Sequence, residues 1–584
     1  MTGPTLLDNT GNSKLIEVIS SWGIDLYAGV NGGGVIHLAK YLLPFEGLKQ
    51  ANDGVPRLLN IPEHIAGYVP LGHYLASGKI AAALFTTGGA TLLGASGMLD
   101  AKLHDIPAVY LIALNATIAN GRGPLQDMTP DGLNAISTVR SIYGERCLLV
   151  DDIGKLKDVL EKAQTLLKES MPVAILFYPD VLSKETVNFT VPWIKGKSGV
   201  SEKDLNQFLS EFPEQIKDKR VVIYVGEEAA RYEGIKKQIN ALSEILKAPV
   251  IYSMNGVNAV SSDNKYAAGY IHFGFNDWAK QLWDSLSSKD IVVVLGFDPG
   301  EYEMNMGNIP ANVWHFTNFV KPYGSKNGNF KHRVDGSYNE VRGDIALALS
   351  KLLPKLLEKI HERQEPKIPS DLNSRQIEKP GPQHADFVEF YKNFLGLLQH
   401  NRKTIIINDV CQAYKDFQYV TQRPINGIAV YSAHRGSVMG HSLGMGIGAK
   451  IAVPEKNVHA FAGDGCFAYF GGALAYVRDF CINMWVIDNK NYHIVDKGLD
   501  VVMPNIDRQR HHSRLPDVDF AGVAEKYGWQ SYYLEPNLSN LQQIMGECAM
   551  SKKSVLVQIP VDGNIVIGQN PRLLNLRRAG GVYL

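Results

Sequence analysis

Short apolar runs rich in β-branched residues alternate with amphipathic stretches along most of this chain. Runs of this kind are typical of strands that are buried on both faces of a parallel sheet, with helices between them. The alternation therefore predicts an α/β protein built from doubly wound parallel sheets. The clearest runs lie at residues 108–113, 221–225, 291–295, 404–407 and 485–487.

Two polar segments interrupt this alternation. Residues 192–202 combine glycine, proline, serine and charged residues, and residues 361–384 carry four prolines with almost no apolar periodicity. Such compositions are typical of linkers. They predict three doubly wound domains, at residues 1–190, 200–360 and 380–584.

Composition supports several domains and excludes some classes of partner. Hydrophobic residues make up 45% and charged residues 20% of the 584 residues, a length that exceeds what one hydrophobic core supports. Lys+Arg and Asp+Glu both total 59, so the charge balance gives no support for a nucleic-acid or membrane partner. Residues 1–14 lack a signal-peptide pattern, and the five scattered cysteines form no CxxC pair. We therefore expect a cytoplasmic protein without structural zinc or a disulfide scaffold.

The most informative segment begins at Gly463-Asp464-Gly465. An apolar run at residues 458–462 precedes it, so the motif should lie at the carboxyl end of a strand, where open parallel sheets bind ligands. The two glycines allow a bulky anion to approach the backbone. A helical stretch predicted at residues 473–480 would offer its N-terminus to a diphosphate.

A second strand is predicted at residues 483–487, and Asn489 follows it closely. Asp464 and Asn489 are 25 positions apart and should lie at the ends of two strands joined by one crossover helix. Proteins normally hold Mg²⁺ through a few such oxygen ligands together with phosphate oxygens. A lone GDG is more often a simple turn, but the asparagine at this distance favours a metal and diphosphate site.

This segment resembles the diphosphate-binding motif of thiamine-diphosphate (ThDP) enzymes. The resemblance implies that Asp464, Asn489 and Asn491, the last through its backbone carbonyl, hold Mg²⁺. Asp488 departs from the family, because an asparagine that is not itself a metal ligand is usual there. The ThDP contacts implied in the same segment are Gly463, Asp464, Gly465, Cys466, Asn489, Asn491, His493 and Ile494.

Upstream, residues 434–444 (HRGSVMGHSLG) resemble the loop that bends the cofactor in this family. The resemblance implies that Met439 wedges the two rings of ThDP into a V shape and that the Ser437 carbonyl accepts a hydrogen bond from the pyrimidine 4′-amino group. A methionine is more commonly a gap-filling core residue, so only its position in the loop favours the cofactor role. Cys411 and Gln412 resemble another turn that contacts the diphosphate.

The N-terminal part resembles the family independently. Residues 62–79 align without gaps with the helix that carries the activating glutamate, which implies that Glu63 hydrogen-bonds N1′ of the pyrimidine and favours its imino tautomer. Burial would raise the pKa of such a carboxyl. A lone glutamate near a helix start is usually a solvated partner of the helix dipole. Pro70 should kink this helix.

The order of the domains implies an active site between two subunits, with Glu63 from one subunit and Asp464 from the other. We therefore expect a homodimer as the minimum active unit, or a homotetramer. The expected small-molecule partners are a 2-oxo acid and a carbonyl acceptor.

Three features bear on the reaction. The His-His pair that serves protonation in pyruvate-decarboxylase-type members is absent from residues 114–131, and Val495 stands where those members carry an acid. Gln126-Asp127 resembles the Gln-Glu of the acetolactate synthase branch. Without a ready proton donor, the acyl carbanion on the cofactor would last long enough to attack a second carbonyl. We expect decarboxylation of a small 2-oxo acid such as pyruvate and ligation of the acyl unit to an acceptor.

The resemblance assigns substrate contacts to Gly32, Gln126, His441 and Val495. A lyase working in the cleavage direction, or a simple 2-oxo acid decarboxylase, would carry the same motifs. Residues 444–449 imitate the fingerprint of a nicotinamide oxidoreductase, but they lack its strand–turn context and its ribose-binding acid.

Two segments leave further alternatives. The basic run at residues 508–514 is either a solvated loop or an anion-binding lid for an acidic or phosphorylated acceptor. Residues 296–300 lack the arginine and paired aspartates of FAD-binding members, and residues 226–228 replace a glycine-rich turn. We therefore expect no FAD in the central domain.

Overall fold

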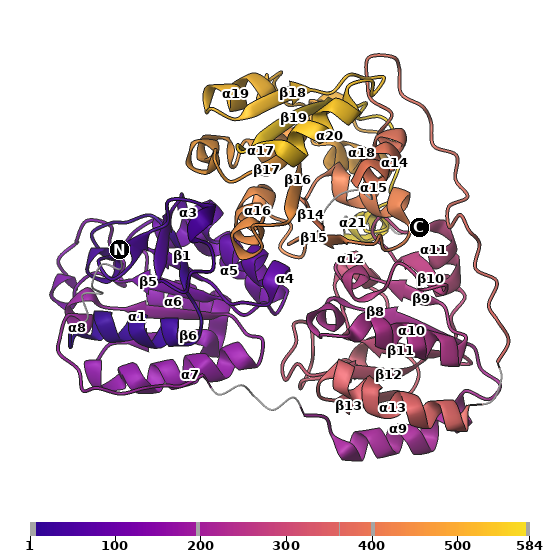
Figure 1. The fold of residues 1–584 in the computed structure, drawn as a ribbon, viewed down its shortest axis with the longest axis horizontal. Helices are drawn as coiled ribbons and strands as arrows, with labels where there is room; N and C mark the ends of the chain where they lie inside the picture. Colours follow the sequence, from indigo (N-terminus) through magenta and orange to yellow (C-terminus); the bar gives the residue numbers. More distant parts are fainter. Residues whose placement is uncertain (1–7, 194–198, 361–362, 399–402, 580–584) are drawn as a thin grey trace.

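The computed structural model describes residues 8–193, 199–360, 363–398 and 403–579. Three sheets divide the chain into three lobes, which Figure 1 shows in indigo to purple, in magenta and in orange to yellow. The N-terminal sheet has the spatial order β2 (Leu43–Pro44), β3 (Arg57–Asn60), β1 (Leu26–Gly29), β4 (Ala82–Phe85), β5 (Val109–Ala113), β7 (Val173–Phe177) and β6 (Cys147–Val150).

The other two sheets each have six strands. The central sheet has the order β10 (Ala267–Tyr270), β9 (Val250–Tyr252), β8 (Val221–Val225), β11 (Ile291–Leu295), β12 (Asn312–Thr317) and β13 (Tyr338–Arg342). The C-terminal sheet has the order β15 (Ile428–Tyr431), β14 (Thr404–Asn408), β16 (Asn457–Gly463), β17 (Ile482–Asp488), β19 (Val555–Pro560) and β18 (Gln530–Tyr533). Every pairing between these strands is parallel, so the predicted fold of three doubly wound parallel sheets is confirmed.

Helices cover the faces of each sheet (Figure 1). The N-terminal domain contains α1 (Gly11–Ser21), α2 (Ile36–Ala39), α3 (Glu63–Ala66), α4 (Val69–Ser77), α5 (Ala90–Leu103), α6 (Ala135–Tyr143), α7 (Leu156–Lys168) and α8 (Pro179–Leu182). The central domain contains α9 (Glu202–Gln215), α10 (Ile235–Leu246), α11 (Asp277–Asp284), α12 (Glu301–Met304) and α13 (Ile345–Lys359). The C-terminal domain contains α14 (Phe387–Leu398), α15 (Gln412–Thr421), α16 (His441–Ala452), α17 (Asp464–Phe467), α18 (His493–Val502), α19 (Phe520–Lys526), α20 (Leu541–Met550) and α21 (Leu573–Ala579).

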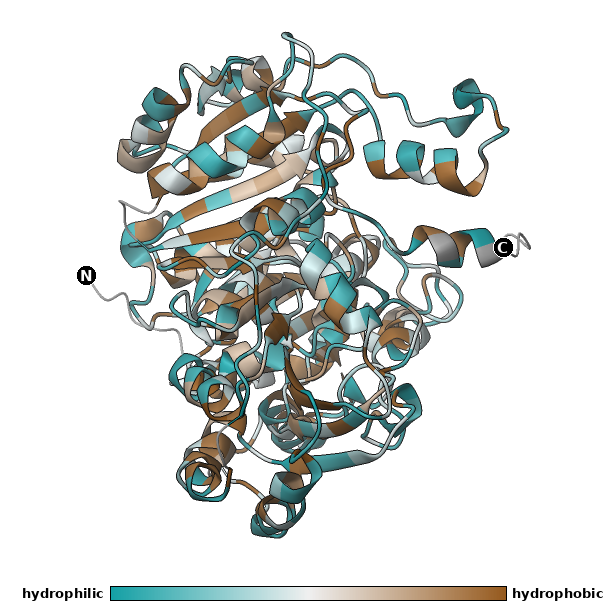
Figure 2. Cartoon of the chain, turned by 90° about the vertical axis from the view of Figure 1, so that its right-hand side faces the viewer, coloured by the Kyte–Doolittle hydropathy of each residue, from teal (hydrophilic) through white to brown (hydrophobic). Residues whose placement is uncertain are grey.

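The apolar runs of the sequence form the buried strands. All five residues of β8, β11 and β14 are buried, because helices cover both faces of these sheets. Figure 2 shows the same segregation, with brown concentrated on the strands and teal on the loops. In the described residues, no helix is both long enough and apolar enough to cross a bilayer.

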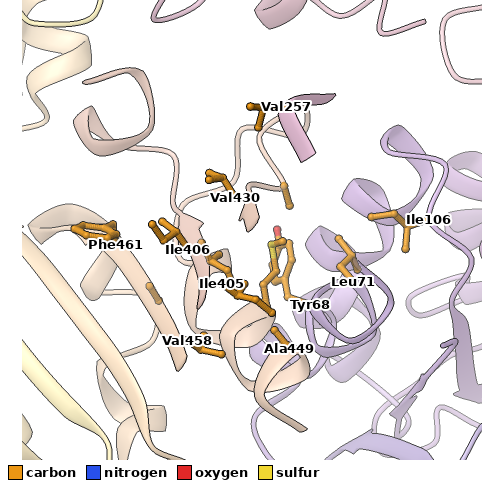
Figure 3. Packing of buried hydrophobic residues seen from close by; sticks show 14 of the residues in the cluster. Tyr68, Leu71, Ile106, Val257, Ile405, Ile406, Val430, Ala449, Val458 and Phe461 are labelled. Atoms are coloured by element: carbon orange, nitrogen blue, oxygen red, sulfur yellow. The ribbon is translucent and has the colours of Figure 1, made fainter. Parts of the chain in front are cut away.

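The N-terminal and C-terminal domains meet along α4 and α16. A Cβ atom added at Gly72 of α4 would lie 1.9 Å from the Met445 carbonyl oxygen, so the two backbones approach more closely than any side chain would allow. Figure 3 shows Tyr68 and Leu71 beside Ala449 at this junction. The expected kink at Pro70 is confirmed, because α3 ends at Ala66 and the proline falls in the first turn of α4.

One expectation about the elements needs correction. The helical stretch expected at residues 473–480 is a 3₁₀ segment, Gly471–Val477, and the helix nearest the GDG motif is the four-residue α17, which begins at Asp464 itself. Two glycines at 471 and 472 disfavour a longer α-helix there.

The described part of the second linker, residues 363–384, has no helix or strand, as predicted. It is nevertheless anchored, because Arg363 donates hydrogen bonds to three carbonyl oxygens of the central domain.

Candidate active site

A cavity of about 270 Å³ opens at the carboxyl ends of β14, β16 and β17. The strand order of the C-terminal sheet reverses at this point, because β14 pairs with β15 on one side and with β16 on the other. Ligands bind at this point in open α/β sheets. All twelve residues that the sequence assigned to cofactor contacts, from Cys411 to Ile494, line this cavity.

Asp464 lies on the wall of this cavity, at the end of β16. Its Oδ1 accepts a hydrogen bond from the backbone N–H of Gly465 at 2.8 Å, and its Oδ2 accepts one from the N–H of Asn489 at 3.1 Å. The side chain is 8% exposed. Burial raises the pKa of this carboxyl to about 6, and the backbone N–H groups offset only part of that effect. A cation beside Asp464 would compensate for the buried negative charge.

The neighbouring asparagines supply further oxygens. Asn489 donates from Nδ2 to Gln412 Oε1 at 3.0 Å and accepts from the backbone N–H of Asn491 at 3.0 Å. The Oδ1 atom of Asn491 is buried and has no hydrogen-bond partner among the described residues. A buried acceptor without a donor is costly unless a cation or another ligand satisfies it. One carboxylate and amide oxygens together are the ligand set that Mg²⁺ prefers.

Comparison with known proteins places this geometry in a family. Residues 9–135, 216–351 and 413–559 match the N-terminal TPP binding domain, the central domain and the C-terminal TPP binding domain of thiamine pyrophosphate enzymes. The chain belongs to the thiamine-diphosphate-dependent enzymes.

Curated relatives of this ThDP enzyme are similar over most of their length. The acetolactate synthase large subunit of Lactococcus lactis is 22% identical over 546 residues, covering 89% of this chain and 87% of its own. A probable acetolactate synthase large subunit of Methanocaldococcus jannaschii is 24% identical and covers 94% and 92%. The structure of the Rhodococcus jostii thiamine diphosphate-dependent 4-hydroxybenzoylformate decarboxylase superimposes with a TM-score of 0.75 at 14% identity, covering 95% of this chain and 99% of that one. That superposition supports the fold alone.

The loop that presents Ser437 and Met439 to the cavity is held from two sides. Ser437 has a φ of +54°, a left-handed conformation that is uncommon for a residue with a side chain. Asp409 is fully buried and accepts hydrogen bonds from the N–H groups of Gly440 and Ser442, each at 3.0 Å. These bonds fix the conformation of the loop on the side of the C-terminal domain.

The N-terminal domain holds the other end of the same loop. Asp100 of α5 is fully buried and accepts hydrogen bonds from the backbone N–H of Gly436 at 2.6 Å and from the Tyr68 hydroxyl at 3.1 Å. Burial raises the pKa of Asp100 to about 6, while His441 and His434 lower it by their charge. The two domains of one chain therefore position the cofactor loop jointly.

Glu63 does not line this cavity within one chain. It is the first residue of α3 and is half-buried. Leu92, Leu93 and Leu125 of the same domain are 52%, 55% and 91% exposed. The role of Glu63 and the second subunit on which it depends stay predictions.

The four residues assigned to substrate contacts lie in different places. Val495 lines the cavity, and His441 is fully buried behind the cofactor loop, where its Nε2 lies 3.1 Å from the Asn408 carbonyl oxygen. Gly32 and Gln126 lie together in the N-terminal domain, because both contact the segment after β4. A Cβ on Gly32 would lie 2.6 Å from Thr86 Oγ1, and Gln126 Oε1 accepts a hydrogen bond from Thr87 at 2.8 Å.

Sequence analysis missed one wall of the cavity. Phe273 and Tyr302 come from the central domain, and Asn570 and Arg572 come from the segment before α21. Phe273 stacks on Tyr414 with ring centroids 4.8 Å apart and an interplanar angle of 7°. No motif marks these residues, since they approach the cavity only through the packing of the domains.

The central domain places carboxylates where a dinucleotide would have to bind. Glu227 follows β8 and Asp298 follows β11, the two strands at which the strand order of this sheet reverses. His104 Nδ1 lies 2.8 Å from Glu227, and Arg435 forms an ion pair with Asp298. These buried polar groups come from all three domains, and the Arg435 guanidinium compensates the carboxylates.

The basic run at residues 508–514 is partly paired. Arg508 forms ion pairs with Asp496 and Asp500, and His511 Nδ1 lies 3.0 Å from Asp496 Oδ1. Arg510 is exposed, as expected for a solvated loop. The run borders the segment that follows β17, because the backbone N–H of Tyr492 donates to the Ser513 carbonyl oxygen at 2.8 Å.

Proposed function

We propose that this ThDP enzyme decarboxylates a small 2-oxo acid, such as pyruvate, and transfers the acyl unit to a carbonyl acceptor. The observation that carries the proposal is the single cavity that joins the metal-ligand oxygens of Asp464 and Asn489 to Met439, with the apolar Val495 at its edge. The similarity to acetolactate synthases over most of the chain supports the ligation step.

In this proposal the cofactor supplies the electron sink for cleaving and forming the bond next to the carbonyl. Asp464, Asn489 and Asn491 would hold Mg²⁺ and, through it, the diphosphate. Ser437 would accept a hydrogen bond from the 4′-amino group at its backbone carbonyl. Met439 would keep the two rings bent toward each other.

Proton transfer decides between ligation and simple decarboxylation. Glu63 of the second subunit would hold a proton at the pyrimidine N1′. Burial lowers the pKa of His493 to about 3, so this imidazole is neutral and is only a weak acid. Val495 has no proton to offer. An acyl unit that is not protonated here can react with a second carbonyl compound.

We further propose a homodimer or homotetramer that binds no FAD. The exposed leucines 92, 93 and 125 support a second subunit. The buried carboxylates of Glu227 and Asp298, already paired with His104 and Arg435, leave an anionic dinucleotide without free cations at that crevice.

Product analysis tests this function. Purified enzyme with ThDP and Mg²⁺ is incubated with pyruvate alone and with pyruvate plus an added aldehyde or ketone, and the products are identified by mass spectrometry. We expect a 2-hydroxy ketone or 2-hydroxy acid ligation product. Free acetaldehyde as the only product in both incubations would establish a simple decarboxylase. Cleavage of added hydroxy ketones without ligation would establish a lyase.

A further inference from the structure

Arg572 lines the same cavity as Asp464, at the rim formed by the C-terminal segment. Its Nε lies 3.0 Å from Glu301 Oε2, and Glu301 directly precedes the cavity-lining Tyr302. Among the residues that the structure describes, neither terminal amino group of this guanidinium donates a hydrogen bond. Both Nη groups can therefore donate to a ligand without breaking a bond to these residues.

The segment that carries Arg572 is fixed in place. The backbone N–H of Gly568 donates to Asp416 Oδ1 at 2.8 Å, and the Gln569 carbonyl oxygen accepts from the N–H of Gly274 at 2.8 Å. Asn575 Nδ2 donates to the second carboxylate oxygen of Glu301 at 2.8 Å. A guanidinium held in this way loses little freedom when it binds an anion.

Two indirect contacts connect Arg572 with Ser437 and Val495, which line the same cavity. The helix after it, α21, contacts α18, and a Cβ added at Gly498 of α18 would lie 3.1 Å from Leu573. Val495 belongs to the first turn of α18. The Tyr302 hydroxyl lies 2.8 Å from Ser437 Oγ. In the proposed function Ser437 contacts the 4′-amino group of the pyrimidine and not the diphosphate, which favours a substrate contact for an arginine near Ser437.

Arg572 is the one lysine or arginine among the cavity-lining residues that the structure describes. Nearby, the aromatic rings of Phe273, Tyr302 and Tyr414 form an apolar wall. Apolar surroundings strengthen an ion pair, and a planar guanidinium binds a carboxylate through two parallel hydrogen bonds.

We propose that Arg572 binds a substrate carboxylate that is retained through the reaction, an inference that rests on the proposed function. A guanidinium bound to the departing carboxylate would stabilise the ground state more than the transition state, because negative charge leaves that group as CO₂ forms. The bound group is therefore the carboxylate of an acidic acceptor, or a second carboxylate on the donor. Glu301 is a positioning residue, since it orients the guanidinium.

Binding of unreactive probes tests the site without turnover. Holoenzyme loaded with ThDP and Mg²⁺ is titrated by NMR with lactate and with lactamide, which differ by the carboxylate alone. We expect the wild-type protein to prefer lactate, and Arg572→Gln to reduce the ratio of the two affinities about tenfold or more. Arg577→Gln removes the same charge from α21, the helix that follows Arg572, at a position outside the cavity lining, so it should leave the ratio near the wild-type value.

The outcomes separate the possible roles. The proposal would be overturned if wild type and Arg572→Gln had the same ratio of lactate to lactamide affinity. It would also be overturned if Arg572→Gln and Arg577→Gln lowered that ratio equally. Weaker ThDP binding by Arg572→Gln, measured by quenching of tryptophan fluorescence, together with an unchanged ratio would assign the residue to the diphosphate instead. Turnover with acidic and neutral acceptors of equal size then distinguishes an acceptor carboxylate from one on the donor. Failure of wild-type enzyme to ligate any acceptor would contradict the proposed function. The ratio of lactate to lactamide affinity would still show whether Arg572 binds a carboxylate.

Discussion

At the scale of single residues, the cavity depends on buried polar groups whose charges the fold itself only partly compensates. Burial raises the pKa of Asp464, the Oδ1 atom of Asn491 has no hydrogen-bond partner among the described residues, and Asp409 and Asp100 hold the loop that carries Ser437. A local sequence pattern explains Asp464 and Asn491. Asp100 lies far along the chain from Ser437 and accepts a hydrogen bond from the backbone N–H of Gly436. A backbone donor requires no particular side chain, so the sequence does not indicate this contact.

Asp100 provides a pH-dependent prediction. Its pKa is raised to about 6 in the folded protein, so its contribution to stability is fully present below pH 3.8 and is lost as the pH rises through 6. In wild type this residue should lower the free energy of unfolding by about 2–3 kcal/mol between pH 4 and pH 7. Asp100→Asn should lack this component, as measured by urea unfolding at both pH values. An identical pH dependence in the two proteins would show that the pKa of Asp100 is not raised.

At the scale of elements, the contact of α4 with α16 joins the first and third domains. The contact requires glycine on both helices, since a Cβ on Gly448 of α16 would lie 2.0 Å from the Val69 carbonyl oxygen. Two helices that approach this closely set the distance between Asp100 and the loop it holds. The same helices begin close to Glu63 and to Met439, so their contact also orients both proposed cofactor contacts.

Gly72→Ala tests this contact. Its Cβ would meet the Met445 carbonyl oxygen at 1.9 Å, and the helices would have to separate, at a cost of about 3 kcal/mol. Thermal unfolding should show a clear decrease in Tm. Gly396→Ala is the matched control, because Gly396 is an exposed residue inside α14 with no atom near its Cβ position. That variant should be more stable by about 0.5–1 kcal/mol. Similar Tm values for both variants would argue against a rigid α4–α16 contact.

At the scale of the whole molecule, we propose that one chain carries two halves of a site, each of which a second subunit completes. The cavity at Asp464 lacks an activating carboxylate, and Glu63 lies outside it together with Gly32 and Gln126, which share the edge of another sheet. The exposed leucines around this edge favour association. A symmetric dimer would complete two sites at once.

Mixing inactive subunits tests this arrangement. Glu63→Gln and Asp464→Asn should each reduce kcat more than about a hundredfold, because each removes one half of every site. If the halves come from different subunits, denaturing and refolding the two variants together should restore about a quarter of wild-type activity, since half of the dimers carry one intact site. Refolding each variant alone is the control. No recovery in the mixture would indicate that each site lies within one chain.

The sequence by itself determined the strands, the parallel α/β class and the segment from Gly463 to Ile494. These features are local, because burial on two faces demands continuous apolar runs and a diphosphate site demands glycines and oxygen ligands at a fixed spacing. The domain boundaries and the role of each site residue stay predictions. Only the tertiary structure decided that Tyr302 and Arg572 join this cavity, that Asp100 holds its loop, and that Glu63 lies outside it. Those relations depend on how three domains pack, and packing brings together residues hundreds of positions apart whose types carry no local signal.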